Sequence, residues 1–177
     1  MRRKNIKDII RNYFFVNPNS KLRVREIEKE LEIPLPSVIR YVKELKSEGI
    51  LKIIKIGNVV FYSADRSSDT YILEKKLFNI KSLYSSGFVE YLRIVLSNPS
   101  TVVFGSYAKG EDIESSDIDL YIETASKKEI DVEKFEKLLK RKIQIFRYKS
   151  ITDVKNIHLA NNIINGVNLN GFVEVFK

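Results

Sequence analysis

Apolar positions in the first third of the chain repeat at helical spacing and then change to strand spacing. Apolar residues that recur three and four positions apart predict helices over residues 6–14, 23–32 and 38–45, the last of them ending at Gly49. Residues 50–56 and 58–62 are rich in Ile, Val and aromatic residues and flank Gly57-Asn58. This pattern predicts a two-stranded hairpin directly after the third helix.

The rest of the chain predicts an alternation of helices and strands. A polar break over residues 64–69 precedes an amphipathic helix at 70–84, and Gly87 separates that helix from another that ends at Asn98-Pro99. Further elements are expected as a strand at 101–104, a strand from Asp117 onward, a helix at 132–139, a strand at 143–146, a helix at 154–164 and a short strand at 173–176. We therefore predict an α/β (α+β) protein, with a mixed sheet and flanking helices at 85–177, a linker helix at 67–84 and a separate domain at 1–66.

Residues Gly105 to Asp119 carry the clearest chemistry in the sequence. The predicted strand 101–104 ends at Gly105-Ser106, where backbone N–H groups and a hydroxyl suit an anion such as a triphosphate. Asp117 and Asp119 alternate with apolar residues, so the period of a strand puts both carboxylates on one face. Because neighbouring carboxylates repel each other unless a cation neutralises them, the segment predicts a metal site beside a phosphate site.

This arrangement resembles the signature of the nucleotidyltransferases related to DNA polymerase beta, in particular the minimal nucleotidyltransferase group. The resemblance rests on GSYAKG followed by SDIDL, and it covers residues 85–177. It implies that Asp117 and Asp119 are catalytic and bind Mg²⁺ or Mn²⁺, and that Gly105, Ser106 and Lys109 bind an NTP. It leaves the acceptor open and makes a partner protein one candidate, since related members act as antitoxins that modify a partner toxin.

One residue departs from the pattern of that family. Its members carry a third carboxylate on a later strand, and Gln144 stands at the corresponding place here. An amide binds Mg²⁺ less well than a carboxylate and does not accept a proton. Two hypotheses follow: an enzyme that transfers a nucleotidyl group to an unknown acceptor, or a transcriptional regulator whose degenerate domain senses a nucleotide or binds a partner. Glu123 lies on the face of the acid pair and is expected to be an exposed acid at the strand end.

Positive charge is concentrated in the first predicted domain. Residues 1–66 hold 15 Lys and Arg against 8 Asp and Glu, whereas residues 67–177 hold 16 against 15. Such an excess favours contact with a polyanion. The pattern of residues 5–65 resembles the winged helix-turn-helix domains of prokaryotic transcriptional regulators, which implies double-stranded DNA as the partner.

The expected DNA contacts lie early on the third helix and on the hairpin. They are Ser37, Arg40, Tyr41 and Lys43 on the helix, and Lys52, Lys55 and Asn58 on the hairpin. Protein docking and RNA binding stay open as alternatives for this domain. The helix at 70–84 either pairs with its copy in a homodimer or only packs on the hairpin.

The composition of the chain excludes several kinds of site and chemistry. The chain has no cysteine, which excludes disulfides, thiolate zinc sites and a Cys nucleophile. It shows no long apolar run and no signal-peptide pattern, so we expect a cytoplasmic protein without a membrane partner. His158 is the single histidine and follows Ile157, so we expect it at the surface rather than in a catalytic role.

Overall fold

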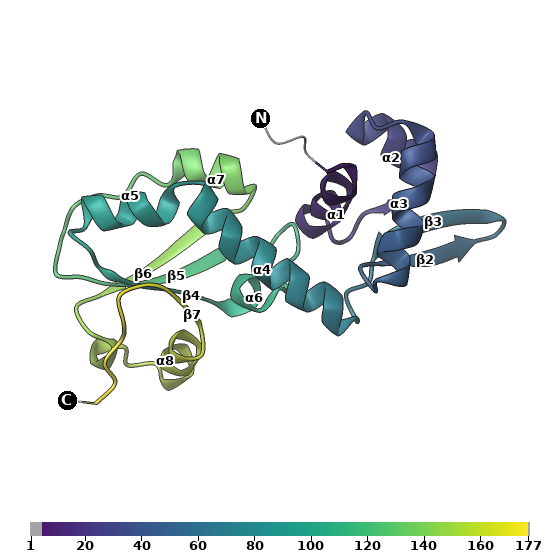
Figure 1. The fold of residues 1–177 in the computed structure, drawn as a ribbon. Coiled ribbons are helices and arrows are strands. Elements are labelled where there is room, and N and C mark those ends of the chain that lie inside the picture. Colours follow the sequence, from purple (N-terminus) through teal and green to yellow (C-terminus); the bar gives the residue numbers. More distant parts are fainter. Residues whose placement is uncertain (1–4, 177) are drawn as a thin grey trace. The chain divides into compact units, whose positions relative to one another are not determined.

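The computed structural model describes residues 5–176, and the chain divides into two compact units, Met1–Phe78 and Asn79–Lys177 (Figure 1). We call them unit 1 and unit 2. Helix α4, Asp69–Ser85, contributes residues to both units. The division therefore falls inside the helix that the sequence predicts at 70–84.

Capped helices build most of unit 1. The Asn5 side chain accepts a hydrogen bond from the Lys7 backbone N–H at 3.1 Å and so caps the first helix. The Arg23 backbone N–H donates to the Glu26 carboxylate at 2.8 Å at the start of the second. The helices are α1 (Ile6–Val16), α2 (Val24–Leu31) and α3 (Leu35–Ser47). They confirm the helices predicted from the apolar spacing.

A small antiparallel sheet completes unit 1. In the order β1-β3-β2, its strands are β1 (Lys21–Leu22), β3 (Val59–Ala64) and β2 (Leu51–Ile56). The β2–β3 turn contains Gly57 at φ +57°, a conformation that glycine adopts without steric cost. Helices and sheet share one core, in which Phe14, Ile27 and Val42 are fully buried. The sequence predicts the hairpin but not β1, because two residues are too few to show a period.

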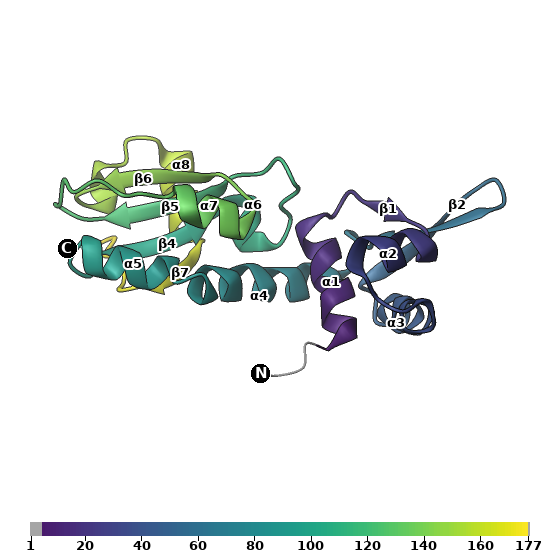
Figure 2. The ribbon, with the colours of Figure 1, turned by 90° about the horizontal axis from the view of Figure 1, so that it is seen from above.

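Unit 2 contains a mixed sheet flanked by helices. Its strands run in the order β6-β5-β4-β7, and Figure 2 shows them side by side. β5 pairs parallel with β6 and antiparallel with β4, whose other neighbour β7 is also antiparallel. The strands are β4 (Ser100–Phe104), β5 (Ile118–Glu123), β6 (Ile143–Tyr148) and β7 (Val167–Asn170). The helices are α5 (Phe88–Val95), α6 (Gly105–Lys109), α7 (Glu133–Leu139) and α8 (Ile157–Ile164), with a 3₁₀ turn at Ile151–Asp153. The α/β class is thus as predicted.

Each face of the sheet in unit 2 has its own apolar core. Figure 1 shows α5 and α7 on one face and α8 on the other. Leu120 of β5 packs in the first core with Phe135 of α7, whereas Tyr121 packs in the second with Ile163 of α8. Because side chains alternate along a strand, Asp119 shares the face of Tyr121. The alternation in β5 therefore directs Asp119 away from α5 and α7.

The last strand lies earlier in the sequence than predicted. Residues 173–176 form no strand, and β7 pairs with β4 instead. Gly171 then turns the chain at φ +65°, and the Ser100 hydroxyl donates to the Phe172 carbonyl oxygen at 2.7 Å. Phe176 is 91% exposed. The prediction of a strand at 173–176 is wrong because the apolar alternation of this segment does not belong to a paired strand.

The helix predicted at 154–164 is also shorter than expected. Val154 follows the 3₁₀ turn, and α8 begins only at Ile157. The Asn156 side chain accepts hydrogen bonds from the His158 and Leu159 backbone N–H groups and so sets the start of α8. The polar cap, rather than the first apolar residue, fixes this boundary.

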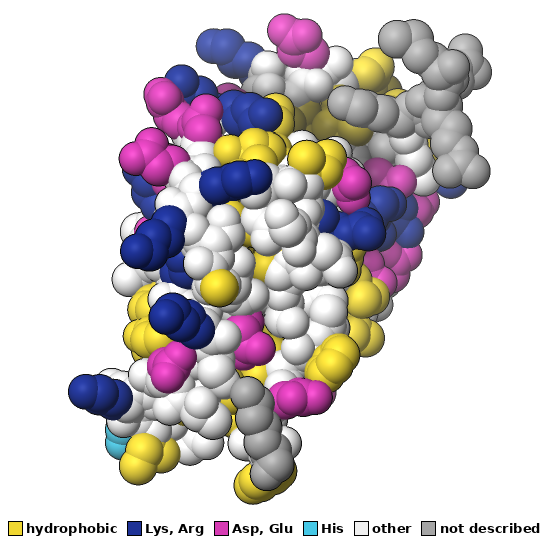
Figure 3. Space-filling model, turned by 90° about the vertical axis from the view of Figure 1, so that its left-hand side faces the viewer, with side chains coloured by type: hydrophobic (Ala, Val, Ile, Leu, Met, Phe, Trp, Pro, Cys, Tyr) yellow, Lys and Arg dark blue, Asp and Glu magenta, His cyan; other side chains and the backbone are white. Residues whose placement is uncertain are grey.

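Side chains of both charge signs are interspersed on the face that Figure 3 presents. Apolar side chains are exposed as well, among them Phe172 at 67% and Phe176 at 91%. Within residues 5–176, no helix has both the length and the apolar character that a membrane crossing requires.

Candidate active site

A sharp turn at Gly105 joins the buried strand β4 to the short helix α6. Gly105 has φ +71°, in the left-handed region that favours glycine. A Cβ atom at this position would collide with the Asp119 carboxylate. The backbone conformation therefore favours glycine at residue 105, and a larger residue would displace the Asp119 carboxylate from its position.

The two predicted acids lie beside that turn, at the start of β5. Asp117 immediately precedes β5 and is exposed, and Asp119 is half-buried. Asp119 is the direct partner of Phe104 in the antiparallel pair of β4 and β5, which explains its closeness to Gly105. Burial, followed by the charge of Asp117, raises the pKa of Asp119. A carboxylate in such surroundings is stabilised by a bound cation.

The donors at this turn suit a divalent ion that arrives with phosphate oxygens. Over the described residues 5–176, no three His, Cys, Asp or Glu side chains lie close enough together to hold a metal ion. Ser106, which follows Gly105 in α6, carries a hydroxyl group next to the turn that Asp119 approaches. One or two carboxylates are the usual protein share of a Mg²⁺ site that is completed by water and substrate phosphates. The residues therefore fit Mg²⁺ as part of a nucleotide complex.

Residues 88–163 match the family model of the nucleotidyltransferase domain. The matched segment begins with α5, ends within α8 and includes the Gly105 turn and the acid pair. Domains of this family generally use an NTP and a divalent metal ion, so the match supports nucleotidyl transfer as the chemistry of this segment. Neither a curated protein nor a solved structure matches the chain.

Within the matched segment, Gln144 is the neighbour of Asp119 on the adjacent strand. The two residues are partners in the parallel register of β5 and β6, and Gln144 is exposed. Partners on neighbouring strands share a face of the sheet, so the amide lies on the face of the acid pair. The sequence predicts Gln144 on this strand, and the register adds that it stands directly beside Asp119.

Glu123 lies at the other end of β5, and its carboxylate is hydrogen-bonded within unit 2. Its carboxylate accepts hydrogen bonds from the Tyr121 hydroxyl at 2.7 Å and from the Ile151 backbone N–H at 3.0 Å. The side chain is half-buried, so the expectation of an exposed acid is wrong. The 3₁₀ turn that follows β6 is hydrogen-bonded to Glu123 through the Ile151 backbone N–H. Glu123 therefore stabilises that turn.

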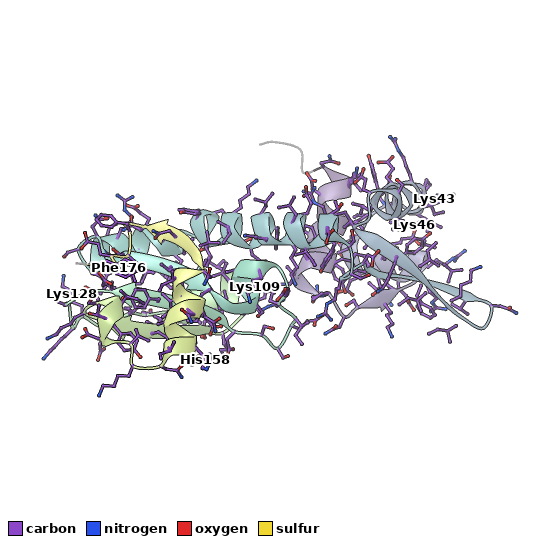
Figure 4. The ribbon with its side chains drawn as sticks, turned by 90° about the horizontal axis from the view of Figure 1, so that it is seen from below. Lys43, Lys46, Lys109, Lys128, His158 and Phe176 are labelled. Atoms are coloured by element: carbon purple, nitrogen blue, oxygen red, sulfur yellow. The ribbon has the colours of Figure 1, made fainter. Side chains whose placement is uncertain are left out.

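Lys109 and His158 are both exposed (Figure 4). Lys109 ends α6, three residues after Ser106, a spacing that puts the two side chains on one side of the helix. His158 lies in the first turn of α8. Lys109 thus lies in the same short helix as Ser106, and His158 has the surface position that the sequence predicts.

A buried polar network holds the loop that carries Asp117. The Asp112 carboxylate accepts hydrogen bonds from the Asn79 side chain at 2.7 Å and from Arg141 Nε and Nη2 at 3.3 and 3.2 Å. The Asn79 side chain also donates to the Tyr107 carbonyl oxygen on α6 at 2.9 Å. The network ties α4, α6 and the start of β6 to the loop before Asp117. Sequence reasoning missed it, because isolated polar residues show no period.

The residues predicted to contact DNA lie on α3 and on the β2–β3 hairpin of unit 1. On α3, Ser37 and Tyr41 are half-buried, whereas Arg40 and Lys43 are exposed. Figure 4 shows Lys43 and Lys46 projecting from α3. Arg40 Nε lies 2.9 Å from the Glu44 carboxylate, so the guanidinium must leave that partner to bind a base edge. On the hairpin, the predicted contacts Lys52, Lys55 and Asn58 are all exposed.

Proposed function

We propose that unit 2 transfers a nucleotidyl group from an NTP to a hydroxyl acceptor. The contact between Gly105 and the Asp119 carboxylate supports this most, because it joins a turn suited to phosphate with a pair suited to a metal ion. The family match over residues 88–163 supports the same chemistry.

In this proposal the Gly105 turn binds the triphosphate. The backbone N–H groups of the turn and the Ser106 hydroxyl donate hydrogen bonds to phosphate oxygens, and Lys109 adds positive charge. Asp117 and Asp119 would hold Mg²⁺ or Mn²⁺, which would supply positive charge to offset that of the phosphates.

The transfer itself is an in-line displacement at the α-phosphorus. The acceptor oxygen forms a bond to phosphorus while the bond to the bridging oxygen breaks, and pyrophosphate leaves with the electron pair. The protein contributes positioning and electrostatic stabilisation rather than covalent chemistry. The rate should therefore depend on the geometry of the turn and on the charge of the acid pair.

A transfer assay tests the proposal. The protein is incubated with each α-phosphate-labelled NTP, Mg²⁺ or Mn²⁺, and a lysate that supplies acceptors. We expect label on an acceptor with the wild type and with the control Glu129→Gln, which changes an exposed loop acid. Asp117→Asn and Asp119→Asn should abolish it. Transfer by Asp117→Asn at the wild-type rate would refute the proposal.

The position of Gln144 beside Asp119 favours a second candidate, a regulator that binds a nucleotide without transferring it. A neutral amide should weaken binding of the ion that would activate the acceptor more than binding of the ion that accompanies the nucleotide. Gln144→Asp separates the two candidates. A large gain in transfer by Gln144→Asp over the wild type would identify the native domain as degenerate. If the wild type is active and the variant transfers at the same rate, the result supports the enzyme hypothesis.

We further propose that unit 1 is a winged helix-turn-helix domain that binds double-stranded DNA. The order of α1, α2 and α3 followed by the β2–β3 hairpin, with β1 added to the sheet, supports this class. The basic excess of residues 1–66 supports a polyanionic partner. A homodimer that pairs through α4 would suit a two-fold DNA site. A cytoplasmic, antitoxin-like role with a toxin as acceptor completes this proposal.

A further inference from the structure

A small pocket lies in unit 2 between the end of α8, β7 and the chain that follows β7. Its volume is ≈ 180 Å³, and among the described residues that line it none carries a charge. Figure 1 shows α8 and the C-terminal segment on one side of the sheet. Pockets that enclose a drug-sized ligand measure about 300–1,000 Å³, so this pocket suits a single ring system.

The pocket belongs to the sheet face that carries Asp119. Val102 of β4 lines the pocket and packs with Ile163 of α8 in the same core as Tyr121. Phe104, two residues after Val102, is the partner of Asp119 on β5. Because residues two apart on a strand share a face, the pocket and the Asp119 carboxylate lie on one side of the sheet.

The strand register sets the separation between the pocket and the acid pair. Asn168 of β7 lines the pocket and is the partner of Val102 on β4. Asn168 therefore stands two strands across and two residues along from Asp119, about 12 Å away by sheet geometry. The sugar and base of a nucleotide, together with the reach of the two side chains, cover that separation.

Gly166 forms the end of the pocket nearest the phosphate-binding turn. Val167 is the partner of Val103, so Gly166 comes next to Phe104, the residue before Gly105. A Cβ atom at Gly166 would lie 2.6 Å from the Val103 carbonyl oxygen. The chain therefore passes close to β4 at this point, and no side chain of residue 166 stands between the pocket and the turn.

Two exposed side chains give the pocket an aromatic surface and a polar group. Phe172 is 67% exposed, and its backbone carbonyl oxygen accepts a hydrogen bond from the Ser100 hydroxyl at 2.7 Å. Asn168 is exposed, and its side chain has no hydrogen-bond partner among the described residues. An amide offers both a donor and an acceptor to a ligand.

We propose that this pocket binds the base of the NTP, with Phe172 stacking on the ring and Asn168 hydrogen-bonding to its edge. The inference rests on the nucleotide site proposed above. Nucleobases are flat, uncharged rings whose edges carry donors and acceptors, so they match an uncharged pocket with an aromatic ring and an amide. The triphosphate stays at the Gly105 turn, and the base reaches across β4 toward β7.

The pocket supplies the selection among NTPs that the rest of the site lacks. The Gly105 turn and the acid pair act on phosphates and metal, which all NTPs have in common. Discrimination therefore needs a group that meets the base. Asn168 is placed for this role, whereas stacking on Phe172 strengthens binding of every base.

Calorimetric titration of the full chain in Mg²⁺ tests the inference. The probes are the α,β-methylene analogues of ATP, CTP, GTP and UTP, which cannot release pyrophosphate, and inorganic tripolyphosphate, which has no base. Phe172→Ala and Asn168→Ala remove the two recognising side chains. The matched controls are Phe176→Ala, at a 91% exposed residue, and Asn162→Ala, at an exposed residue of α8, and neither residue lines the pocket.

We expect at least one analogue to bind about tenfold or more tightly than tripolyphosphate. Phe172→Ala should weaken binding of that analogue by about fivefold or more, because the stacking surface is lost. Asn168→Ala should reduce the difference between the best and the poorest analogue by about fivefold. Both variants should bind tripolyphosphate as the wild type does, which shows that they are folded, and both controls should bind every probe normally.

Three results would overturn the inference. They are equal affinities for tripolyphosphate and all the analogues, wild-type binding by both pocket variants, and an equal loss of binding in Phe172→Ala and Phe176→Ala. Absence of binding by every probe would instead refute the nucleotide site on which the inference rests.

Discussion

Asp119 combines partial burial with a second acid nearby, and both raise the pKa of its carboxyl group, burial more than Asp117. Because the raised pKa belongs to the folded protein, folding favours the protonated form. The contribution of Asp119 to stability is therefore fully present below the ordinary pKa of an aspartate and is lost as pH rises through the raised value.

Asp119→Asn should raise the melting temperature at neutral pH by about 1–4 °C, because the amide cannot ionise. The difference should vanish at a pH well below the ordinary aspartate pKa. Thermal unfolding across pH measures it, with Glu129→Gln as the matched control. A lower melting temperature at neutral pH would show that the Asp119 charge is already compensated within the protein.

A comparison of Gly87 with Gly105 distinguishes the effect of a left-handed backbone conformation from the effect of the close approach of Asp119. Gly105 and Gly87 have similar left-handed φ angles of +71° and +79°, but a Cβ at Gly87 meets nothing within 4 Å, whereas at Gly105 it meets Asp119. Gly87→Ala should lose about 1 kcal/mol of unfolding free energy, and Gly105→Ala should lose more and also fail to bind NTP. Urea unfolding and NTP titration measure both effects. Equal behaviour of the two variants would contradict the proposed contact.

At the scale of elements, the loop from Gly110 to Asp117 depends on the buried pair of Asp112 and Arg141. Asp112→Ala should lower the unfolding free energy by about 3–5 kcal/mol, since it leaves the Arg141 charge buried and uncompensated. Glu133→Ala, which breaks an exposed pair with Lys137, should change it little. Chemical denaturation of both variants tests this. A small effect of Asp112→Ala would mean that water or another group replaces the carboxylate.

The elements that the sequence predicts are those whose own residues carry the signal. The helical spacing in α1 and the two-residue period around Asp119 are local, so these elements follow from the sequence within one or two residues. β1 and β7 are short and exist through pairing with distant strands, so no local period reveals them. The Asn79–Asp112–Arg141 network is likewise produced by tertiary packing, although its residues hold the candidate site together.

At the scale of the whole molecule, the basic excess of residues 1–66 should appear as salt-dependent binding of the full chain to double-stranded DNA. Lys43→Ala/Lys55→Ala should weaken binding and lower the slope of log affinity against log salt by about 1–2. Lys127→Ala/Lys128→Ala, which removes the same charge from unit 2, should leave the slope unchanged. Fluorescence anisotropy with labelled duplex measures both. Equal slopes would argue against DNA contacts on α3 and the hairpin.

The central claim is that the Gly105 turn and the acid pair form one nucleotide–metal site. The most direct measurement is calorimetric titration of each NTP, as a non-hydrolysable analogue, into the full chain with and without Mg²⁺ or Mn²⁺. The account predicts binding of at least one nucleotide that requires the divalent ion and that falls by about tenfold or more in Asp117→Asn/Asp119→Asn, while Glu129→Gln binds normally. Binding that is independent of the ion, or equal in the double variant, would contradict it.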